Sequence, residues 1–449
     1  MSESRLIKPV LEEELPIISH GKGIYLYDME GKQYLDGSSG AVTASIGHGV
    51  GEIQEAMKEQ ASKISFVYRS QFTSIPAEKL ATKLSTLTET ADYYSFLVNS
   101  GSEATETAMK IAIQYWQEKG MNTKQKILSR WMSYHGITIG ALSMSGHTLR
   151  RNRFEPLLED YPTISPPYCY RCPYNETYPN CQLKCATELE KAINRIGEEH
   201  IAAVIMEPIV GAAGAALTPP PGYYEEIRKL CDQYNILFIS DEVMTGIGRA
   251  GKMLALDYWD TVADIVTLGK GLSAGYTPIA AVLVESKIME PIQSGSKVIM
   301  SGHTFSGNPQ SAAAGVAVLD YIEKHNVLKQ TEENGVFLYN LLKKLQRQFP
   351  IIGDIRGKGL LLGLEFVSGL DKTSFPRERQ VTNLVISKSK EAGLLVYPAS
   401  AGDDGVKGDA IIIAPPLTIT KVEIRELVKR LSEALVNVMA ELDGEVEYV

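Results

Sequence analysis

The sequence predicts an α/β protein built around a mostly parallel β-sheet, with a second, smaller domain. Three observations carry this prediction. The chain has 449 residues, enough for two or three domains or for one large α/β domain with an appendage. Short β-branched runs alternate with longer helical patterns, which is typical of βαβ units. The runs are apolar throughout, as expected for strands that are buried on both faces of a parallel sheet.

Composition and charge narrow the class of protein. Hydrophobic residues make up 44% and charged residues 22% of the chain, which excludes disorder, collagen and coiled coil. A net charge of −9 argues against a surface that binds nucleic acid or anionic lipid. The N-terminus lacks the apolar stretch of a signal peptide, so we expect a cytoplasmic protein. Residues 201–222 are almost as apolar as a membrane span, but Glu207 and several prolines and glycines interrupt them, so a short strand and a loop are predicted.

The two ends of the chain predict the smaller domain. Residues 24–28 and 34–36 predict a hairpin around the turn at 30–32, and we expect it to join the second domain. The predicted organisation is an N-terminal segment at 1–55 that packs with the small domain, a large domain at 56–315 with a Cys-rich insertion at 166–186, and a C-terminal small domain at 316–449.

The central elements follow in order along the chain. Strands are predicted at residues 94–98, 126–129, 202–206, 236–240, 264–268 and 280–284. Helices are predicted at residues 103–118 and 223–234, and then at 312–322 and 336–347, before a strand at 357–366.

Polar residues with distinctive chemistry follow several of these strands. In open parallel sheets, ligands bind beyond the carboxyl ends of the strands. Glu207, Asp241 and Lys270 each come just after a predicted strand. A fourth strand leads through the small-residue turn at 99–104 into an amphipathic helix. Such a turn suits a phosphate, although the same residues also serve as an ordinary helix N-cap.

Lys270 and Asp241 each allow two interpretations. A lysine between two glycines after an apolar strand is either solvated or partly desolvated, and a desolvated amine has a lowered pKa and can form a Schiff base. Asp241 is either a helix cap or the partner of a cationic ring nitrogen. Together, the phosphate turn, the aspartate and the lysine match what pyridoxal phosphate requires.

The chain resembles the class III (ornithine/ω-amino-acid type) aminotransferases of fold type I over essentially its whole length. The resemblance implies a large domain with a mostly parallel seven-stranded sheet and a smaller α+β domain. The matching residues are Asp36-Gly37, 99–104, Tyr134-His135-Gly136, Glu207-Pro208, 241–249, 267–271, 302–309 and 414–417.

The resemblance also implies a role for each site residue. Lys270 forms the Schiff base and moves the substrate proton, Asp241 pairs with the pyridinium nitrogen, and Tyr134 stacks on the ring. Thr304 reaches the phosphate of the neighbouring subunit, so a homodimer with a shared active site is implied, and pairing into tetramers stays open. Glu207 is expected among the catalytic residues. The remaining expected cofactor contacts are Ser100, Gly101, Ser102, His135, Glu207, Val243 and Met244.

The sequence departs from part of this family at the substrate site. Members that use 2-oxoglutarate in the GABA or ornithine manner carry an arginine where this chain has Ile412 and a glutamate where it has Ala212, and GABA enzymes carry a further arginine where it has Ile137. The chain is in this respect more similar to the ω-amine:pyruvate branch. Arg69, near the substrate entrance of relatives, is either a surface arginine or a residue that binds a substrate carboxylate or sulfonate, and Lys407 is a second candidate substrate residue. Val42 stands where many amine transaminases have a bulky aromatic residue, so we expect a roomier pocket.

The reaction expected from this resemblance is a ping-pong transfer. An ω-amine or a β- or ω-amino acid donates an amino group, and pyruvate or 2-oxoglutarate accepts it. Another pyridoxal-phosphate reaction on the same scaffold, by an aminomutase, decarboxylase, racemase or phospho-lyase, stays open. No nucleic-acid or membrane partner is expected.

Four of the five cysteines fall in one short segment, with the pattern C-x2-C-x8-C-x3-C at Cys169, Cys172, Cys181 and Cys185. This spacing suits a structural zinc ion held by four thiolates. The alternative is a set of reduced, or occasionally bridged, cysteines that hold a long loop together.

Overall fold

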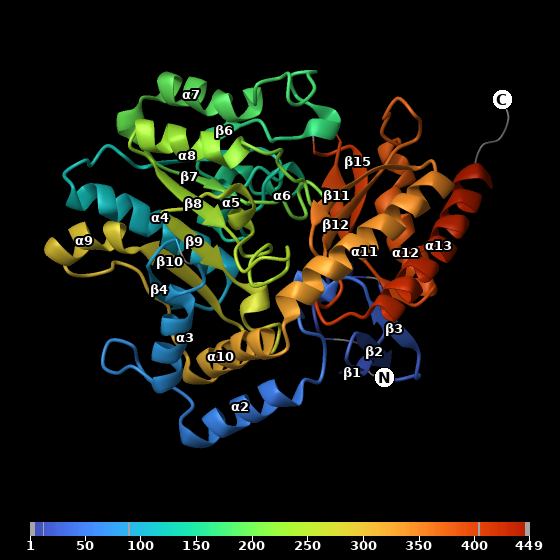
Figure 1. The fold of residues 1–449 in the computed structure, drawn as a ribbon, viewed down its shortest axis with the longest axis horizontal. Coiled ribbons are helices and arrows are strands. Elements are labelled where there is room, and N and C mark those ends of the chain that lie inside the picture. The colour runs from blue at the N-terminus through green and yellow to red at the C-terminus, as the bar shows by residue number, and fades with distance from the viewer. Residues whose placement is uncertain (1–4, 12, 89, 403–404, 445–449) are drawn as a thin grey trace.

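The computed structural model describes residues 5–11, 13–88, 90–402 and 405–444. A seven-stranded sheet with the order β4-β10-β9-β8-β7-β5-β6 forms the large part of the molecule, and a four-stranded sheet with the order β11-β12-β15-β14 lies beside it (Figure 1). A third sheet, β1-β2-β3-β13, joins strands from the two ends of the chain.

The large sheet is parallel except for β10, which runs antiparallel to β4 and β9. The predicted fold class is therefore confirmed, and each of the six predicted strands lies within a residue or two of its expected position. The seventh, β6, has two residues, too few for a pattern to reveal. The strands are β4 (Tyr93–Val98), β5 (Lys126–Arg130), β6 (Thr163–Ile164), β7 (Ile201–Met206), β8 (Leu237–Asp241), β9 (Ile265–Leu268) and β10 (Ala280–Glu285).

Helices cover both faces of this sheet because successive strand residues point to opposite sides. In β7, Ala203 and Ile205 belong to one buried cluster, with residues of α4, whereas Val204 and Met206 belong to another, with residues of α8. The helices of this part are α2 (Gly51–Lys63), α3 (Ile75–Ser85), α4 (Gly101–Glu118), α5 (Ile139–Ser143), α6 (Thr148–Arg151), α7 (Lys184–Ile196), α8 (Tyr223–Gln233), α9 (Ser286–Ser294) and α10 (Pro309–Lys324).

The smaller part is an antiparallel sheet with helices packed against it. One prediction here was wrong: residues 357–366 form no single strand but the end of one strand, a reversal and a second strand. Gly357 and Gly359, with φ of 131° and 54°, let the chain reverse. Because apolar residues flank the reversal on both sides, the sequence pattern is that of one continuous strand. The elements are β11 (Ile352–Lys358), β12 (Leu361–Phe366), β14 (Tyr397–Ala401), β15 (Gly408–Ile413), α11 (Val327–Gln348), α12 (Val381–Glu391) and α13 (Lys421–Gly444).

The N-terminal strands lie against this C-terminal part. The predicted hairpin is present, and its last strand pairs in parallel with β13, with Leu35 opposite Leu394. The exact domain boundaries stay predictions. The elements are β1 (Ile18–Lys22), β2 (Tyr25–Asp28), β3 (Gln33–Asp36), the short turn α1 (Ser39–Val42) and β13 (Leu394–Leu395).

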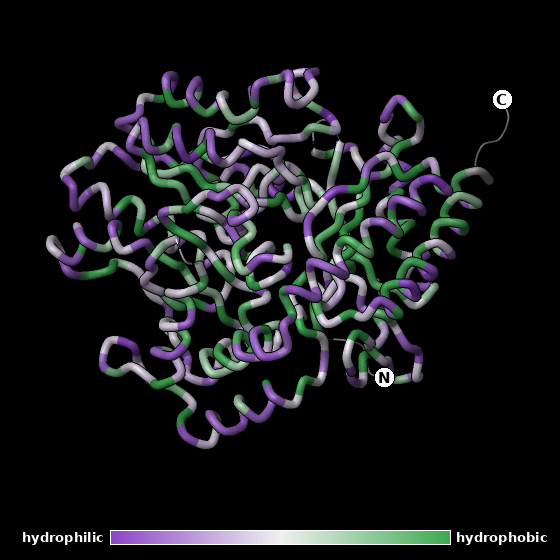
Figure 2. The backbone as a smooth tube through the Cα atoms, in the orientation of Figure 1, coloured by the Kyte–Doolittle hydropathy of each residue, from purple (hydrophilic) through white to green (hydrophobic). Residues whose placement is uncertain are grey.

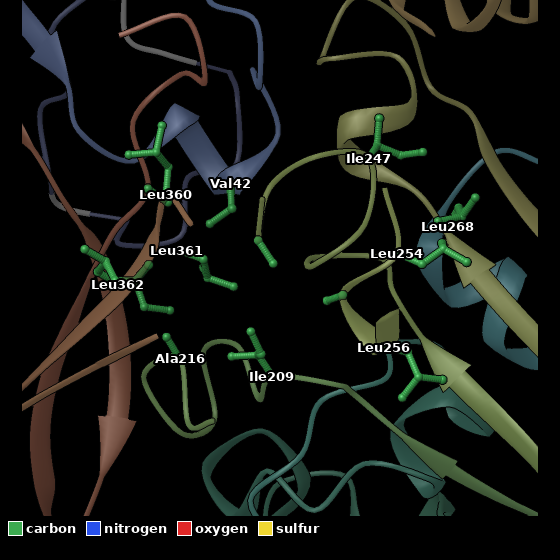
Figure 3. Close-up of a cluster of buried hydrophobic side chains, with 14 of the residues drawn as sticks. Val42, Ile209, Ala216, Ile247, Leu254, Leu256, Leu268, Leu360, Leu361 and Leu362 are labelled. Carbon is green, nitrogen blue, oxygen red and sulfur yellow. The ribbon is translucent and has the colours of Figure 1, made fainter. Parts of the chain in front are cut away.

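One buried core runs across both parts. Leu361 of β12 points toward Ile209, from the loop after β7, and Val42 lies next to it (Figure 3). The hydropathy of the chain follows this arrangement, with apolar strands inside and polar stretches on the outer helices (Figure 2). Over the described part of the chain, we find no helix that is both long and apolar enough to span a membrane. Residues 201–222 form β7 and a loop, as predicted.

Candidate active site

A cavity of about 380 Å³ lies at the carboxyl ends of β4, β7, β8 and β9. The structure brings most of the predicted site residues together there, although they come from strand ends that are far apart in the sequence. The predicted residues that line the cavity are Ser100, Gly101, Ser102, Tyr134, His135, Glu207, Asp241, Val243, Met244 and Lys270.

Asp241 is the last residue of β8, and a set of donors holds its side chain. His135 Nδ1 lies 2.7 Å from Asp241 Oδ2, while the Val243 backbone N–H and the Thr267 hydroxyl donate to Oδ1 at 3.1 and 2.9 Å. The side chain is almost fully buried. These contacts fix the carboxylate at the cavity wall, so it can pair with a cationic group inside the cavity.

Lys270 extends into the cavity from the end of β9. Its Nζ donates to the carbonyl oxygen of Ala41 at 2.7 Å, so the N-terminal turn α1 also reaches the site. Burial lowers the pKa of Lys270 to about 8, although the negative charges of Asp241 and Glu207 oppose this shift. A lysine with this pKa is partly neutral near pH 8 and can act as a nucleophile or as a base.

Glu207 joins two loops beside the cavity. Its carboxylate accepts hydrogen bonds from the backbone N–H of Tyr134 at 2.9 Å and from that of Gly211 at 2.8 Å. Burial raises the pKa of Glu207, and the nearby Asp241 adds to this effect. The geometry therefore gives Glu207 a positioning role for the segment that carries Tyr134.

The turn between β4 and α4 forms another wall of the cavity. The Ser100 hydroxyl accepts from the Glu103 backbone N–H at 3.2 Å, so Ser100 is an N-cap, as one of the two interpretations predicts. The turn also lines the cavity with Gly101 and Ser102, which the second interpretation requires. A Cβ at position 101 would lie 2.8 Å from Val243 Cγ1, so a glycine is needed for this close approach.

Four predicted residues lie outside the lining of this cavity. Val42 is buried next to Ala41, and Lys407 is exposed in the loop 400–409, of which residues 403–404 lie outside the described residues. Arg69 donates to the Ser301 carbonyl oxygen at 2.5 Å and lies over the ring of Phe96. Thr304 is exposed on the surface near this arginine.

Two lining residues, Arg150 and Tyr397, were missed by the sequence analysis. Thr267, noted only as part of the motif 267–271, holds Asp241 from the neighbouring strand. Arg249 had been noted only as part of a motif, but its buried guanidinium donates to the Leu360 and Pro415 carbonyl oxygens and to the Ser39 hydroxyl. It thereby joins the large part, the small part and the N-terminal turn. Arg150 carried no sequence signal, because it lies in a short helix without a motif.

The structure of the cysteine segment does not support a bound zinc ion. None of the five cysteines forms a disulfide, and no three Cys, His, Asp or Glu side chains of the described chain are grouped in a way that could hold a metal ion. The four cysteines of the segment line a small cavity of about 10 Å³, which holds one water at most. Burial raises the pKa of Cys169, and that of Cys185 to about 12, so the thiol form is favoured.

Buried charged groups hold this segment to the small sheet. Glu365 of β12 accepts from the Tyr168 hydroxyl, and it pairs with Arg171 at 2.6 Å and Arg356 at 2.7 Å. Burial alone would raise the pKa of Glu365, but the charge of Arg356 and the hydrogen bonds lower it overall.

Comparisons with known proteins identify the family of the chain. The family model of class-III aminotransferases matches residues 9–435. The chain is 55% identical to an uncharacterized aminotransferase, YodT, of Bacillus subtilis (strain 168), over 96% of this chain and 97% of that protein.

Solved structures give the same result for the fold. An (S)-enantioselective ω-transaminase from Thermomicrobium roseum superposes with a TM-score of 0.91 at 35% identity, covering 97% of each chain. An amine transaminase from an uncultivated Pseudomonas species, in its PLP-bound form, gives a TM-score of 0.92 at 31% identity, covering 97% of this chain and 99% of that one. The likeness over almost the whole chain confirms the predicted fold type I architecture.

Proposed function

The chain belongs to the class-III aminotransferase family, and from this membership we propose that it moves an amino group from an ω-amine or a β- or ω-amino acid to pyruvate or 2-oxoglutarate. One observation carries the proposal: Lys270, with its pKa lowered to about 8, faces Asp241 and Glu207 inside one cavity. Because both substrates would use this cavity in turn, a ping-pong order follows.

The residues of the cavity fit pyridoxal phosphate. The N-terminus of α4, with Ser100, Gly101 and Ser102, offers backbone N–H groups to the phosphate. Asp241 would face the ring nitrogen, and Tyr134 would lie on the ring. His135 supports this fit, because its Nε2 is buried without a hydrogen-bond partner in the described chain while its Nδ1 holds Asp241. Val243 and Met244 complete the wall.

The chemistry is then divided between the cofactor and the chain. When bound, pyridoxal phosphate supplies a conjugated ring that stabilises the carbanion left when a substrate proton departs. Lys270 Nζ would accept that proton and return it, and a pKa of about 8 suits both steps. Asp241 would pair with the ring nitrogen, and Glu207 holds the backbone of Tyr134 in place.

We propose that the functional unit is a homodimer. Large apolar side chains are exposed around Thr304, the residue that the family resemblance assigns to a neighbouring active site: Phe305 is 59% exposed and Met300 is 76% exposed. Phe66 contacts Phe305 edge to face, and Tyr68 and Phe72 are exposed on the same segment. A monomer rarely leaves such a patch in water, and a second copy of this chain would cover it.

The substrate side of the proposal rests on two residues that replace a charged pair of the family. Ile412 stands at the position of the arginine and Ala212 at that of its glutamate partner, and both are buried and uncharged. The structural neighbours include an ω-transaminase, which supports the ω-amine:pyruvate branch. Val42, Arg69 and Lys407 stay proposed substrate residues, and a cytoplasmic location is proposed from the sequence.

The test is the visible absorbance of the protein loaded with pyridoxal phosphate, during addition of ω-amines, β-amino acids and α-amino acids. We expect particular donors to convert the bound cofactor to its aminated form, and pyruvate or 2-oxoglutarate to restore it. A cofactor that binds but never converts with any donor would reject transamination and favour another reaction on the same scaffold.

A further inference from the structure

Arg150 contributes a guanidinium group to the cofactor cavity. It is the last residue but one of α6, it is half-buried, and its Cζ lies 4.3 Å from the centre of the Tyr134 ring. Among the described residues that line this cavity, it is the only arginine. Its positive charge also contributes to lowering the pKa of Lys270, after burial, so both cations face the same space.

Among the described residues, no carboxylate accepts a hydrogen bond from Arg150. No Asp or Glu of the described residues lies within ion-pair distance of its guanidinium, whereas the neighbouring Arg151 donates to the carbonyl oxygens of Leu142, Ser143 and Ser145 and pairs with Glu155. The two acidic groups of the cavity, Glu207 and Asp241, already accept hydrogen bonds elsewhere. The planar guanidinium interacts with the side chain of Tyr134 and keeps further donors that suit a ligand.

A second cavity begins at the same arginine. It has a volume of about 460 Å³, and Arg150 belongs to the lining of both cavities. His147 also lines it, and burial, followed by the charge of Arg150, lowers the pKa of this histidine to about 4, so it carries no charge at neutral pH. Asp409 accepts from the backbone N–H and hydroxyl of Thr382. The volume of this outer cavity leaves room for a substrate that extends past Arg150.

We propose that Arg150 binds an acid group, a carboxylate or sulfonate, of the substrate whose amino or keto group lies at Lys270. This inference rests on the proposed function and names its substrate class: amino acids and keto acids with an acid group beyond the reacting carbon, in preference to neutral amines. Guanidinium groups bind such oxyanions through two parallel charge-assisted hydrogen bonds, which are stronger than neutral ones.

The experiment compares Arg150→Met with the matched control Arg153→Met. The methionine keeps an apolar stem against Tyr134 and removes the charge. Arg153 is three residues away, exposed, and lines neither cavity. The cofactor-loaded proteins are titrated by calorimetry with butanoate and with its uncharged analogue butanamide. The visible spectrum of the bound cofactor, which must stay unchanged, excludes a disturbed ring site.

We expect Arg150→Met to bind butanoate about 10- to 100-fold more weakly than the unmodified protein, with butanamide and the Arg153→Met control unchanged. Equal butanoate affinity in the Arg150 variant, or no preference for butanoate over butanamide in the unmodified protein, would overturn the inference.

A second arm separates this inference from the proposed function. The amination half-reaction is followed with 4-aminobutanoate and with butylamine. A selective loss for 4-aminobutanoate in Arg150→Met supports both proposals, and an equal loss for the two donors would overturn the role of Arg150. Butanoate binding that depends on Arg150, in a protein that no donor can aminate, would reject transamination and still support the acid-group site.

Discussion

Two cavities of this molecule are lined by side chains of reactive types that the sequence analysis singled out. In only one of them does the environment favour the reactive form of the side chain. The cofactor cavity collects Glu207, Asp241 and Lys270 from the ends of different strands. The second collects four cysteines from one continuous segment. In the first, groups of opposite charge face one another. In the second, burial and the other thiols are the main influences on the cysteines.

The same physical effect has opposite chemical consequences in the two places. Burial disfavours the charged form of any side chain. For Lys270 this lowers the pKa to about 8 and produces the neutral amine, which is the reactive form. For Cys185 it raises the pKa to about 12 and keeps the thiol, which is the unreactive form and a poor metal ligand. A cluster of reactive residue types is therefore no site unless its environment favours the reactive protonation state.

The largest effect is expected for Lys270→Ala, which removes the nucleophile and the proton carrier together. Turnover should fall by at least about 10⁴-fold, because covalent attachment and general acid–base catalysis are both lost. The visible band of the lysine-bound cofactor should also disappear, while circular dichroism stays that of a folded protein. Retained transamination in this variant would exclude Lys270 from the reaction.

A large effect on stability, and not on turnover, is expected when Glu365, which holds the cysteine segment to the small sheet, is changed. Glu365→Gln removes the buried charge that Arg171 and Arg356 share, while Asp354 stays paired with Arg356, and the loss should cost about 3 kcal/mol of unfolding free energy. The pKa of Glu365 is lowered in the folded protein, so its stabilisation is present at neutral pH and is lost only as the pH falls below about 4. Denaturant unfolding at pH 7 measures the loss, with the exposed Glu55→Gln as control.

Asp241→Asn tests the charge on the other side of the cofactor cavity. The amide keeps the size of the side chain but removes the negative charge from the ring nitrogen, and we expect kcat to fall about 10²- to 10³-fold. The exposed Asp160→Asn is the matched control. A variant with the turnover of the unmodified protein would show that this carboxylate serves only as a cap.

The sequence predicted these two regions unequally. The strand-end residues of the large sheet could be placed because parallel strands bring their carboxyl ends to one edge, so Asp241 and Lys270 had to lie near each other. Arg150 and Tyr397 could not, since their approach depends on how the small sheet and a one-turn helix pack against that edge. The cysteine spacing predicted a cluster correctly, but spacing alone does not determine whether thiols converge on one point.

A smaller effect is expected from pH. Since burial lowers the pKa of Lys270 to about 8, the amine is protonated below this pH and neutral above it. The rate at which the cofactor-free protein captures pyridoxal phosphate should therefore rise about 30-fold from pH 6.5 to 9 and level off above about 8. Stopped-flow absorbance measures this rate. A rate that keeps rising to pH 10 would give Lys270 the ordinary lysine pKa and remove the contrast with Cys185.

The smallest effect is expected in the cysteine segment itself. Because Cys169 and Cys172 lie at the surface or near it, and the described chain groups no metal ligands there, Cys169→Ser and Cys172→Ser should each change turnover by less than about 2-fold and stability by about 0.5 kcal/mol or less. Atomic emission on freshly purified, unchelated protein should find no stoichiometric zinc, and a chelator should leave the unfolding midpoint unchanged. If the unmodified protein holds stoichiometric zinc and both variants lose it, the four thiols do converge on one point in solution. The two cavities would then differ in the ligand that each one binds.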